Sequence, residues 1–453
     1  MGELGPRLVI AGTHSGVGKT TVATGLMAAW RSRGVRVTAA KVGPDYIDPG
    51  YHALATGRPG RNLDAWMGGA AAVPALAGRA ARDGELLVIE GVMGLFDGAA
   101  DGTPSSTAVV ASLLDAPVIL VVDAASMSSS VAALVHGFAT WDPAVTVAGV
   151  ILNRVGSASH EIMLRAALEP VGVPVVGALH RNDALAWRDR HLGLIPVVEH
   201  PGAVAAALHR LTVALEAGCD LDTIHRIARE APRRVVSEPA LPQAVGGSPR
   251  IAMAAGAAFS FAYEDNREAL AAAGAEIVPF DPLHDPALPD ACAALVVGGG
   301  FPEVYAQGLA ENRPLLADLA ARVDAGLVVW AECGGLLWLA QELDGHRMAG
   351  VIQATASMTE QLTLGYCSGT TTAASPLGPA GTNLRGHEFH YSATDPPGAA
   401  LDLEGRLGWR RSGFTTPRLL ASYLHVHLGA APELAAAFVR TAANAVSATR
   451  PLR

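Results

Sequence analysis

Short apolar runs alternate with segments of helical periodicity along the first half of the chain. Short runs rich in valine, leucine and isoleucine are typical of strands that are buried on both faces of a sheet. The predicted strands are residues 8–11, 35–40, 86–90, 118–123, 147–152 and 173–178. Helical segments fall between them, and a helical stretch over about 201–231 would close the domain. This alternation predicts a parallel sheet with helices on both faces.

The alternation of predicted strands and helices is interrupted near the middle of the chain and then resumes. The stretch SEPALPQAVGGSPR, which begins at Ser237, is rich in proline and glycine and poor in apolar residues, so we predict a linker there. Beyond it we predict strands at 250–255, 275–279, 293–297 and 327–331, helices at 264–273 and 315–325, a meandering β section over 346–425 and a terminal helix over 432–446. The predicted organisation is therefore one α/β domain over 1–236, a linker over 237–249 and a second α/β domain over 250–453.

Composition narrows the class of protein. Apolar residues make up 50% of the chain and charged residues 17%, which excludes a mostly disordered chain. The net charge is −9 and no long basic run occurs, so we expect no nucleic-acid partner. Apolar runs such as residues 117–122 are far too short to span a bilayer, and the N-terminus does not read as a signal peptide. Together with four scattered cysteines that form no CxxC pair, this predicts a cytoplasmic protein without a membrane partner.

A glycine-rich loop, GTHSGVGKTT, lies between the first predicted strand and an apolar-periodic helix. In that setting glycines let backbone N–H groups turn toward phosphate oxygens, and the helix N-terminus adds its positive end. The candidate nucleotide-binding residues of the loop are Gly16, Gly18, Lys19, Thr20 and Thr21. Lys19 would reach the β and γ phosphates of ATP, and the Thr20 hydroxyl would bind Mg²⁺. Asn153 ends the fifth predicted strand, where its amide would either read the adenine edge or only cap the strand.

The loop departs from two versions of this motif. The strict GxxxxGK[ST] pattern has glycine at position 13, where this chain has Thr13 preceded by Gly12. The partition-type variant has lysine at position 14, where this chain has His14. A glycine-rich turn with a chance Lys-Thr pair is the alternative, but the strand before the loop and the helix after it favour phosphate binding.

Two further loops carry charged residues at the ends of the second and third predicted strands. Their sequences are KVGPDYIDP, which starts at Lys41, and EGVMGLFDG, which starts at Glu90. Ligands of open α/β sheets bind beyond the carboxyl ends of the strands, so both loops are expected to face the phosphate loop. Asp45 and Glu90, close to their strand ends, are predicted to bind Mg²⁺, whereas Asp48 is expected at the crevice mouth, away from the phosphates. The alternative is that Asp45 and Asp48 only shape a proline-rich turn.

The second half of the chain contains a candidate nucleophile, Cys333, in the sequence AECGG. We predict a sharp turn from strand to helix there, with the small residues Ala331 and Gly335 two positions before and after the thiol. Such an elbow exposes the thiol, and the helix N-terminus favours the thiolate. The segment GGGFPE, which ends an earlier strand, would supply backbone N–H groups for an oxyanion hole. His425 would accept the thiol proton, and His427, on the same face of a strand, would orient it.

These motifs together resemble the cobyrinic acid and hydrogenobyrinic acid a,c-diamide synthase family. In chain order they are GTHSGVGKTT, KVGPDYIDPGYH, RNLDAWM, EGVMGLFDG, GGGFPEVY, AECGGLLWL, RGHEFHYS and ASYLHVH, and they spread over almost the whole chain. The N-terminal half also looks like dethiobiotin synthetase, and the C-terminal half looks like a class I glutamine amidotransferase domain. The resemblance implies a P-loop domain with a parallel sheet, followed by a flavodoxin-like amidotransferase domain.

The resemblance also implies a two-part reaction that uses a corrinoid substrate, L-glutamine, ATP and Mg²⁺. Glutamine is hydrolysed at Cys333, with His425 as the base. The ammonia then attacks a corrin carboxylate that ATP has activated as an acyl phosphate, first on the c and then on the a acetate side chain. In this scheme Lys41, Asp48 and Asp97 lie near the reacting carboxylate.

Other interpretations stay open at this level. Many class I glutaminases have a glutamate two residues after the histidine, where this chain has His427, so the resemblance implies a Cys-His dyad.

A sibling function is that of cobyric acid synthase, which amidates four other carboxyls, but the RGHEFHYS and GPDYIDP segments favour the diamide enzyme. A non-catalytic ATP switch or corrinoid sensor is a different class, and the intact pair of Cys333 and His425 speaks against it. For the oligomeric state, the alternatives are a monomer and a homodimer.

Overall fold

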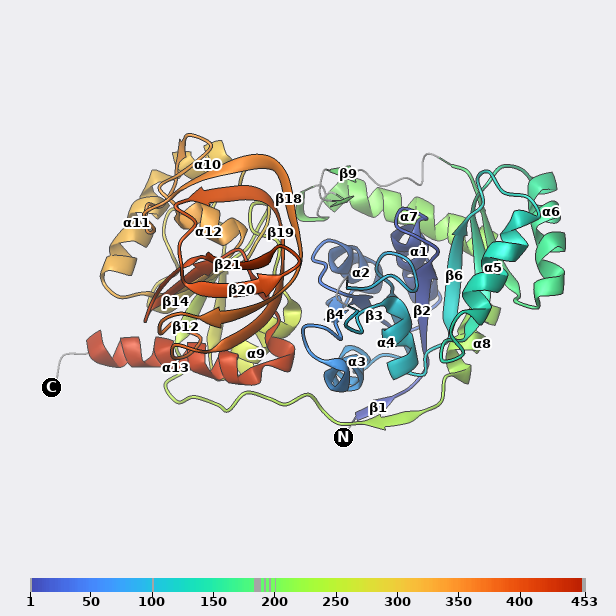
Figure 1. Ribbon diagram of the computed structural model, residues 1–453, viewed down its shortest axis with the longest axis horizontal. Coiled ribbons are helices and arrows are strands. Elements are labelled where there is room, and N and C mark those ends of the chain that lie inside the picture. The colour runs from blue at the N-terminus through green and yellow to red at the C-terminus, as the bar shows by residue number, and fades with distance from the viewer. Residues whose placement is uncertain are drawn as a thin grey trace. The chain divides into compact units, whose positions relative to one another are not determined.

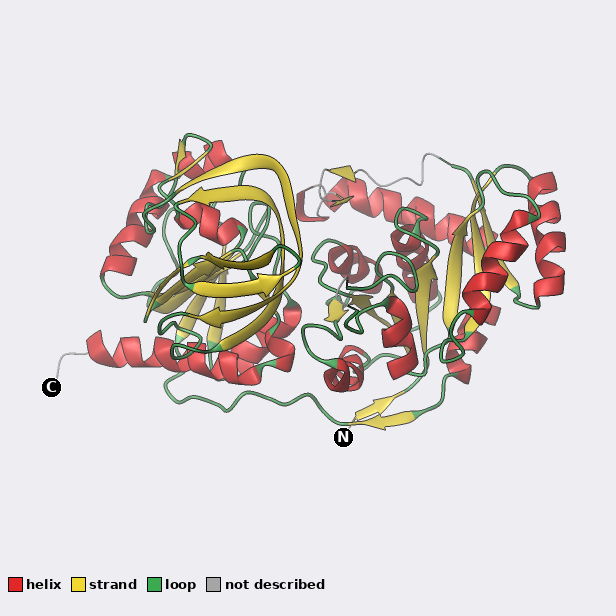
Figure 2. Cartoon of the chain, in the orientation of Figure 1, coloured by secondary structure: helices red, strands yellow, loops and turns green. Residues whose placement is uncertain are grey.

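The computed structural model describes residues 2–99, 102–182, 189–190, 193–194, 197–199 and 201–449. The chain forms two compact units, Met1–Pro239 and Ala240–Arg453, which run from blue to green and from yellow-green to red in Figure 1. Each unit combines helices and strands, as the red and yellow segments of Figure 2 show. Of the helices that the structure describes, none is both long and apolar enough to cross a membrane.

The first unit is built on a seven-stranded sheet whose neighbouring strands all run parallel. The strand order is β4 (Arg61–Leu63), β3 (Val37–Val42), β5 (Leu86–Glu90), β2 (Arg7–Gly12), β6 (Val118–Asp123), β7 (Val147–Val155) and β8 (Val175–His180). Every residue of β2, β3 and β5 is buried, as expected when helices cover both faces. The predicted parallel sheet is confirmed. Strand β4 was not predicted, because its sequence RNL offers a single apolar residue.

Helices cover both faces of this sheet. One apolar core joins the sheet to α1 (Lys19–Ser32), α2 (Asp48–Thr56), α7 (Pro201–Gly218) and α8 (Leu221–Glu230), and the other to α3 (Val73–Ala80), α4 (Thr107–Leu113), α5 (Ser130–Thr140) and α6 (Ala158–Leu168). The stretch predicted as helical over 201–231 forms two helices. Asp220 accepts a hydrogen bond of 2.9 Å from the N–H of Thr223 and so caps the start of the second helix. A short antiparallel pair, β1 (Gly2–Leu4) and β11 (Arg234–Val236), joins the two ends of the unit.

The second unit contains a six-stranded sheet. Its strand order is β13 (Glu276–Phe280), β12 (Arg250–Ala254), β14 (Cys292–Val297), β15 (Val328–Glu332), β23 (Leu419–Ser422) and β22 (Phe414–Thr416). The first five strands run parallel, and β22 pairs antiparallel with β23. Apolar cores join one face to α10 (Ala306–Glu311), α11 (Arg313–Asp324) and α12 (Gly334–Leu339), and the other to α9 (Glu264–Ala272) and α13 (Pro432–Thr449).

A second sheet occupies the region predicted as a meandering β section. Two long strands, β18 (Thr355–Thr371) and β19 (Asn383–Asp395), form an antiparallel pair that curves through the orange part of Figure 1. The sheet is completed by β16 (Glu342–Leu343), β17 (His346–Arg347), β20 (Leu401–Gly405), β21 (Gly408–Ser412) and β24 (His425–Val426). Strand β24 follows β23 after two residues, so the chain passes there from one sheet to the other. That crossing places His425 opposite His387 of β19.

Candidate active sites

The phosphate loop joins β2 to α1 in the first unit. Gly18 has φ +94°, and an added Cβ would lie 2.3 Å from Nδ2 of Asn153, so only glycine fits there. The next residue, Lys19, is buried, and its Nζ donates a hydrogen bond of 3.1 Å to the carbonyl oxygen of His14. Gly16 also has a positive φ, and Thr21 is partly exposed in the first turn of α1. The loop therefore has the curled backbone and the inward lysine that phosphate binding needs.

Asn153 supports this loop from the end of β7. Its Nδ2 donates a hydrogen bond of 2.8 Å to the carbonyl oxygen of Val17. The neighbouring Arg154 donates from Nη2 to the carbonyl oxygen of Gly16 at 2.8 Å, and its backbone N–H donates to Oδ1 of Asn153 at 2.9 Å. Both polar atoms of the Asn153 amide are thus engaged with backbone groups. This geometry favours a role in holding the loop, while the reading of an adenine edge stays a prediction.

A buried cluster of charged residues lies beside Thr20. The Thr20 hydroxyl donates to Oε1 of Glu90 at 2.6 Å, and its oxygen also lies 3.2 Å from Oδ2 of Asp48. The Nζ of Lys41 lies 2.6 Å from Oδ2 of Asp48 and 2.9 Å from Oε1 of Glu90. His52 contributes Nε2, which lies 2.6 Å from Oε2 of Glu90. The ends of β3 and β5, the start of α2 and the phosphate loop therefore meet at one point.

One of these positions, Asp48, differs from the sequence expectation. Asp48 was expected at the crevice mouth, but it is 8% exposed and lies within hydrogen-bond distance of Thr20, because α2 begins at Asp48 and directs this side chain toward the sheet edge. Oδ1 of Asp45 accepts hydrogen bonds from the backbone N–H groups of Ile47 and Asp48 at 2.8 and 3.0 Å, so it holds the turn before α2, as the turn alternative predicted. Binding of Mg²⁺ by Asp45 stays a prediction.

Asp97 and His52 are the remaining charged or polar residues of the first site that we describe. Oδ2 of Asp97 accepts a hydrogen bond of 2.8 Å from the N–H of Gly94, and its charge acts on Lys19. Sequence reasoning did not single out His52, although the motif that contains it was recognised. The spacing of His52 could have identified it. Residues four apart on a helix share a face, and His52 follows Asp48 by four positions.

Charge balance in the cluster shifts several pKa values. Burial lowers the pKa of Lys19 to about 8, and the positive charge of Lys41 adds to the effect. Burial opposes the charge of Lys41 as well, but the Asp48 and Glu90 carboxylates outweigh it and raise the Lys41 pKa. Burial would raise the pKa of Glu90, yet Lys41 and His52 hold it below its usual range. Burial together with the charges of Asp45 and Glu90 raises the pKa of Asp48, so this pocket carries more carboxylates than Lys41 alone neutralises.

The oxygen atoms of this cluster fit a small divalent cation. Mg²⁺ is usually held by one or two carboxylates together with phosphate oxygens and waters. The Thr20 hydroxyl and the carboxylates of Glu90 and Asp48 form such a partial set next to the phosphate loop. Within the described part of the chain, no three His, Cys, Asp or Glu side chains form a metal site of their own. A cation here would therefore depend on nucleotide phosphates for its remaining ligands.

Cys333 lies at the predicted turn from strand to helix in the second unit, but it is only 7% exposed, so the exposed thiol expected of such an elbow is not found. It lies between β15 and α12 with φ 47° and ψ −102°, a strained conformation that is rare for residues other than glycine. Its N–H donates a hydrogen bond of 2.8 Å to the carbonyl oxygen of Ser422 in β23. An added Cβ on Gly335 would lie 2.5 Å from the carbonyl oxygen of Val297, so a larger residue would push the turn away from β14. Gly335 also donates to the carbonyl oxygen of Gly298 at 3.1 Å, which brings the predicted oxyanion segment beside the elbow.

His425 lies next to this thiol and is hydrogen-bonded to it. Its ring stacks on that of His387, with centroids 4.9 Å apart. Burial alone would lower the pKa of His425, but the interactions with Cys333 and Glu332 outweigh it and raise the pKa to about 9. The structure thus brings the predicted nucleophile and base together. Sequence reasoning missed Glu332, although it directly precedes Cys333.

His427 lies against a different set of groups. Its Nε2 is 3.6 Å from Oδ2 of Asp265, and its ring packs edge-on against Tyr263 with centroids 4.8 Å apart. Strand β24 ends at Val426, so the strand alternation that predicted a shared face for His425 and His427 does not extend through both residues.

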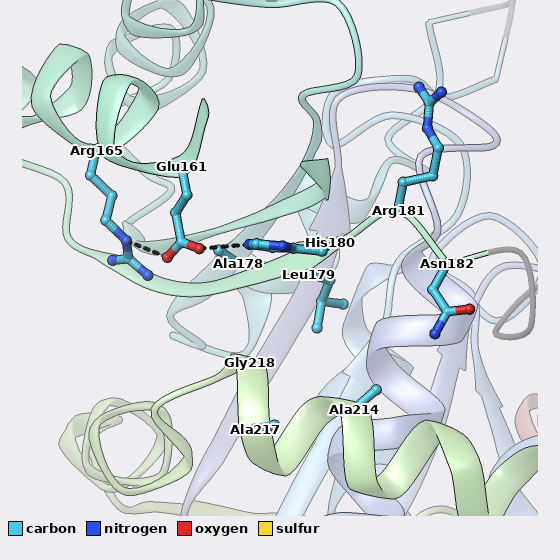
Figure 3. A pocket seen from close by; sticks show the side chains of 10 residues that line it. All are labelled: Glu161, Arg165, Ala178, Leu179, His180, Arg181, Asn182, Ala214, Ala217 and Gly218. Atoms are coloured by element: carbon cyan, nitrogen blue, oxygen red, sulfur yellow. Dashed lines mark hydrogen bonds and ion pairs between the residues drawn. The ribbon is translucent and has the colours of Figure 1, made fainter. Parts of the chain in front are cut away.

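A separate pocket of about 490 Å³ lies beside the end of β8 in the first unit. Figure 3 shows Glu161 pointing toward both Arg165 and His180, which it contacts at 2.8 and 2.9 Å. The opposite charges of Glu161 and Arg165 therefore offset each other inside the pocket. None of the predicted site residues lines it, so it is distinct from the cluster around Thr20.

Comparison with known protein families finds a matching family for each of the two units. Residues 8–194 match the CobQ/CobB/MinD/ParA nucleotide binding domain. Residues 250–433 match the CobB/CobQ-like glutamine amidotransferase domain. The two matched segments contain, respectively, the phosphate loop and the Cys333 elbow, in the order expected from the motifs.

Relatives with curated names align over nearly the whole chain. The hydrogenobyrinate a,c-diamide synthase of Streptomyces coelicolor is 49% identical over 97% of this chain and 98% of its own length. The protein of the same name from Thermobifida fusca is 45% identical over 98% of both chains. The cobyrinate a,c-diamide synthase of Syntrophotalea carbinolica is 42% identical over 96% of this chain and 98% of its own length.

Proposed function

We propose that this chain, which belongs to the family of hydrogenobyrinate and cobyrinate a,c-diamide synthases, converts the a and c acetate carboxylates of a corrinoid to carboxamides. The reaction consumes ATP and takes its nitrogen from L-glutamine. One observation carries the proposal: a single chain holds a phosphate loop tied to a carboxylate cluster and a thiol elbow paired with a histidine. Neither site alone makes an amide, whereas the two chemistries together do.

The glutaminase half-reaction follows from the elbow. The Cys333 sulfur attacks the side-chain carbonyl of glutamine, while His425 takes the thiol proton and passes it to the departing ammonia. Backbone N–H groups of the segment that begins at Gly298 would stabilise the oxyanion, apart from those of Gly299 and Phe301, which donate to the carbonyl oxygens of Phe261 and Ala258. Water, activated by His425, then hydrolyses the thioester to release glutamate and the free thiol.

The ligase half-reaction follows from the phosphate loop. A carboxylate oxygen of the corrinoid attacks the γ phosphorus of ATP and displaces ADP, which gives an acyl phosphate. Ammonia then attacks the acyl carbon and displaces inorganic phosphate, leaving the carboxamide. Lys19 and Lys41 offset the negative charge that phosphates and substrate bring together. Asp97 is proposed to lie near the reacting carboxylate, together with Lys41.

Mg²⁺ is part of this proposal. Thr20 and Glu90 would hold it, as predicted, with Asp48 as the second carboxylate because Asp48 contacts Thr20 and Oδ1 of Asp45 is occupied by the turn. When bound, the cation supplies charge neutralisation on the β and γ phosphates.

The cobalt-free corrin, hydrogenobyrinate, is the proposed substrate, because the relatives named for it share higher identity with this chain than those named for cobyrinate. The test is incubation of the purified chain with ATP, Mg²⁺, glutamine and either corrin, followed by mass spectrometry of the product. Two amide groups added to hydrogenobyrinate are expected. Four amides would indicate a cobyric acid synthase, and ATP hydrolysis without amidation of either corrin would indicate a switch or sensor.

A further inference from the structure

A buried carboxylate lies beside the base of the thiol site. Glu332 ends β15 directly before Cys333 and is 5% exposed. Its Oε1 accepts a hydrogen bond of 2.8 Å from the N–H of Val426, and its Oε2 lies 3.7 Å from Nδ1 of His425. One side chain thus connects the strand that presents the nucleophile with the strand that presents the base.

We propose that Glu332 is the positioning residue of the glutaminase and completes a Cys333–His425–Glu332 arrangement. This inference rests on the proposed function, because it takes Cys333 as the group that attacks glutamine. A buried carboxylate is costly unless hydrogen bonds and opposite charge compensate it, and here the Val426 N–H and the imidazolium of His425 do so. In return, the carboxylate fixes the ring and stabilises the charge that His425 acquires from the thiol.

The other titratable groups around the ring do not supply this negative charge. Burial, together with the charge of His425, holds the pKa of His387 well below its usual range, so His387 stacks on the base as a neutral ring. Burial lowers the pKa of His390 to about 4, so this side chain is neutral too. Cys333, Glu332, His387 and His390 are among the titratable groups that act on His425. Glu332 is the carboxylate of this set.

The position of Glu332 explains the histidine that follows the base by two residues. Residue 427 lies beyond the end of β24, so its side chain faces Asp265 and Tyr263 and not the ring of His425. In this chain the carboxylate comes from β15, and His427 forms a second pair with Asp265 at 3.6 Å. Among the described residues of this unit, His425 with Glu332 and His427 with Asp265 form buried His–carboxylate pairs, and the first of them reaches the thiol. Asp265 is therefore a matched control.

The test uses the full chain and the variants Glu332→Gln, Glu332→Asp and Asp265→Asn. The kcat and KM of glutamine hydrolysis are measured together with the rate of Cys333 alkylation by iodoacetamide from about pH 6 to 9.5, a span that brackets the ordinary thiol pKa. The Cys333→Ala variant gives the background from the other cysteines. Melting temperature and ammonia-dependent amidation report on the fold and on the first unit.

The amide of Glu332→Gln still accepts the Val426 N–H but carries no charge. We expect kcat to fall about 10²-fold with little change in KM. Replacing the aspartate of a Ser-His-Asp triad with its amide lowers kcat roughly 10⁴-fold. The effect here should be smaller, because the 3.7 Å separation between Oε2 of Glu332 and Nδ1 of His425 exceeds a hydrogen bond. Thiolate formation at neutral pH should fall, so alkylation slows below about pH 8 and rises near the ordinary thiol pKa. Glu332→Asp should recover part of the kcat and part of the alkylation rate at neutral pH. Asp265→Asn should keep the wild-type alkylation profile.

Three outcomes would overturn the assignment. The first is wild-type kcat and alkylation in Glu332→Gln, and the second is an alkylation profile that shifts in Asp265→Asn but not in Glu332→Gln. The third is a lower kcat in Glu332→Gln that comes with a lower melting temperature and an unshifted alkylation profile. The alkylation profile needs no glutamine, so it tests Glu332 by itself. Failure of the wild-type chain to release ammonia from glutamine would count against the proposed function alone.

Discussion

The hydroxyl of Thr20 donates a hydrogen bond of 2.6 Å to Oε1 of Glu90. These residues are 70 positions apart in the chain, and they meet because β2 and β5 are neighbours in the parallel sheet. The same hydroxyl lies 3.2 Å from Asp48, so the phosphate loop and the carboxylate cluster form one connected site. Substitutions at these positions therefore have distinct expected effects.

Glu90→Gln and Asp48→Asn should each raise the Mg²⁺ concentration needed for half-maximal amidation at least about tenfold, because a lost charged contact costs roughly 1.5–3 kcal/mol. Asp45→Ala should leave the Mg²⁺ response near wild type and instead lower stability by about 1 kcal/mol, since Oδ1 of Asp45 accepts hydrogen bonds within the turn before α2. Kinetics across a Mg²⁺ series and thermal melts separate these effects. A Mg²⁺ response of Asp45→Ala that equals that of Glu90→Gln would restore Asp45 as a metal ligand.

Cys333→Ala should abolish glutamine-dependent amidation and retain amidation from ammonium salts, because only the thioester step is lost. Product formation with each nitrogen source is the measurement. If a folded Cys333→Ala chain made no product at high ammonium concentration, the two chemistries would not be separable.

ATP affinity should fall as the pH rises above about 8, where Lys19 loses its proton in the ATP-free protein. Phosphate contacts favour charged Lys19, so ATP binding takes up a proton, and the dissociation constant should rise toward tenfold per pH unit between the free and bound pKa values. Calorimetric titrations at about pH 7 to 9.5 in buffers of different ionisation enthalpy measure the affinity and the proton uptake.

Lys19→Ala is the control for this pH dependence. It should bind ATP weakly with a flat profile over the same range and should amidate from neither glutamine nor ammonia. A persisting slope in this variant would assign the titration to another group, and retained ammonia-dependent synthesis would exclude Lys19 from carboxylate activation.

Gly18→Ala and Gly335→Ala should have opposite effects on the two half-reactions. The first forces φ near +94° on alanine and sets its Cβ 2.3 Å from Nδ2 of Asn153, and strain of this kind costs roughly 1–3 kcal/mol. It should weaken ATP binding and leave ammonia release from glutamine intact. Gly335→Ala, whose Cβ meets the carbonyl oxygen of Val297 at 2.5 Å, should do the reverse. Loss of both activities in either variant would indicate general unfolding, which melting curves would reveal.

Local sequence was sufficient for the features that depend on neighbouring residues. The apolar runs determined the parallel sheet of the first unit, because strands buried on both faces need continuous apolar residues. Glycines and Lys19 specified the phosphate loop, and small residues around Cys333 specified the elbow, since both depend on backbone conformations within a few residues. The motifs also identified the family.

Tertiary structure decided which side chains meet. The first turn of α2 brings Asp48 to Thr20 and leaves Oδ1 of Asp45 on a turn, an outcome that depends on where the helix starts rather than on distance along the chain. The contact between Glu332 and His425 spans 93 positions and exists because β15 and β23 are neighbours and β24 follows β23. Such pairings follow from strand order in the sheets, and strand order is set by packing of the whole unit, which no local pattern encodes.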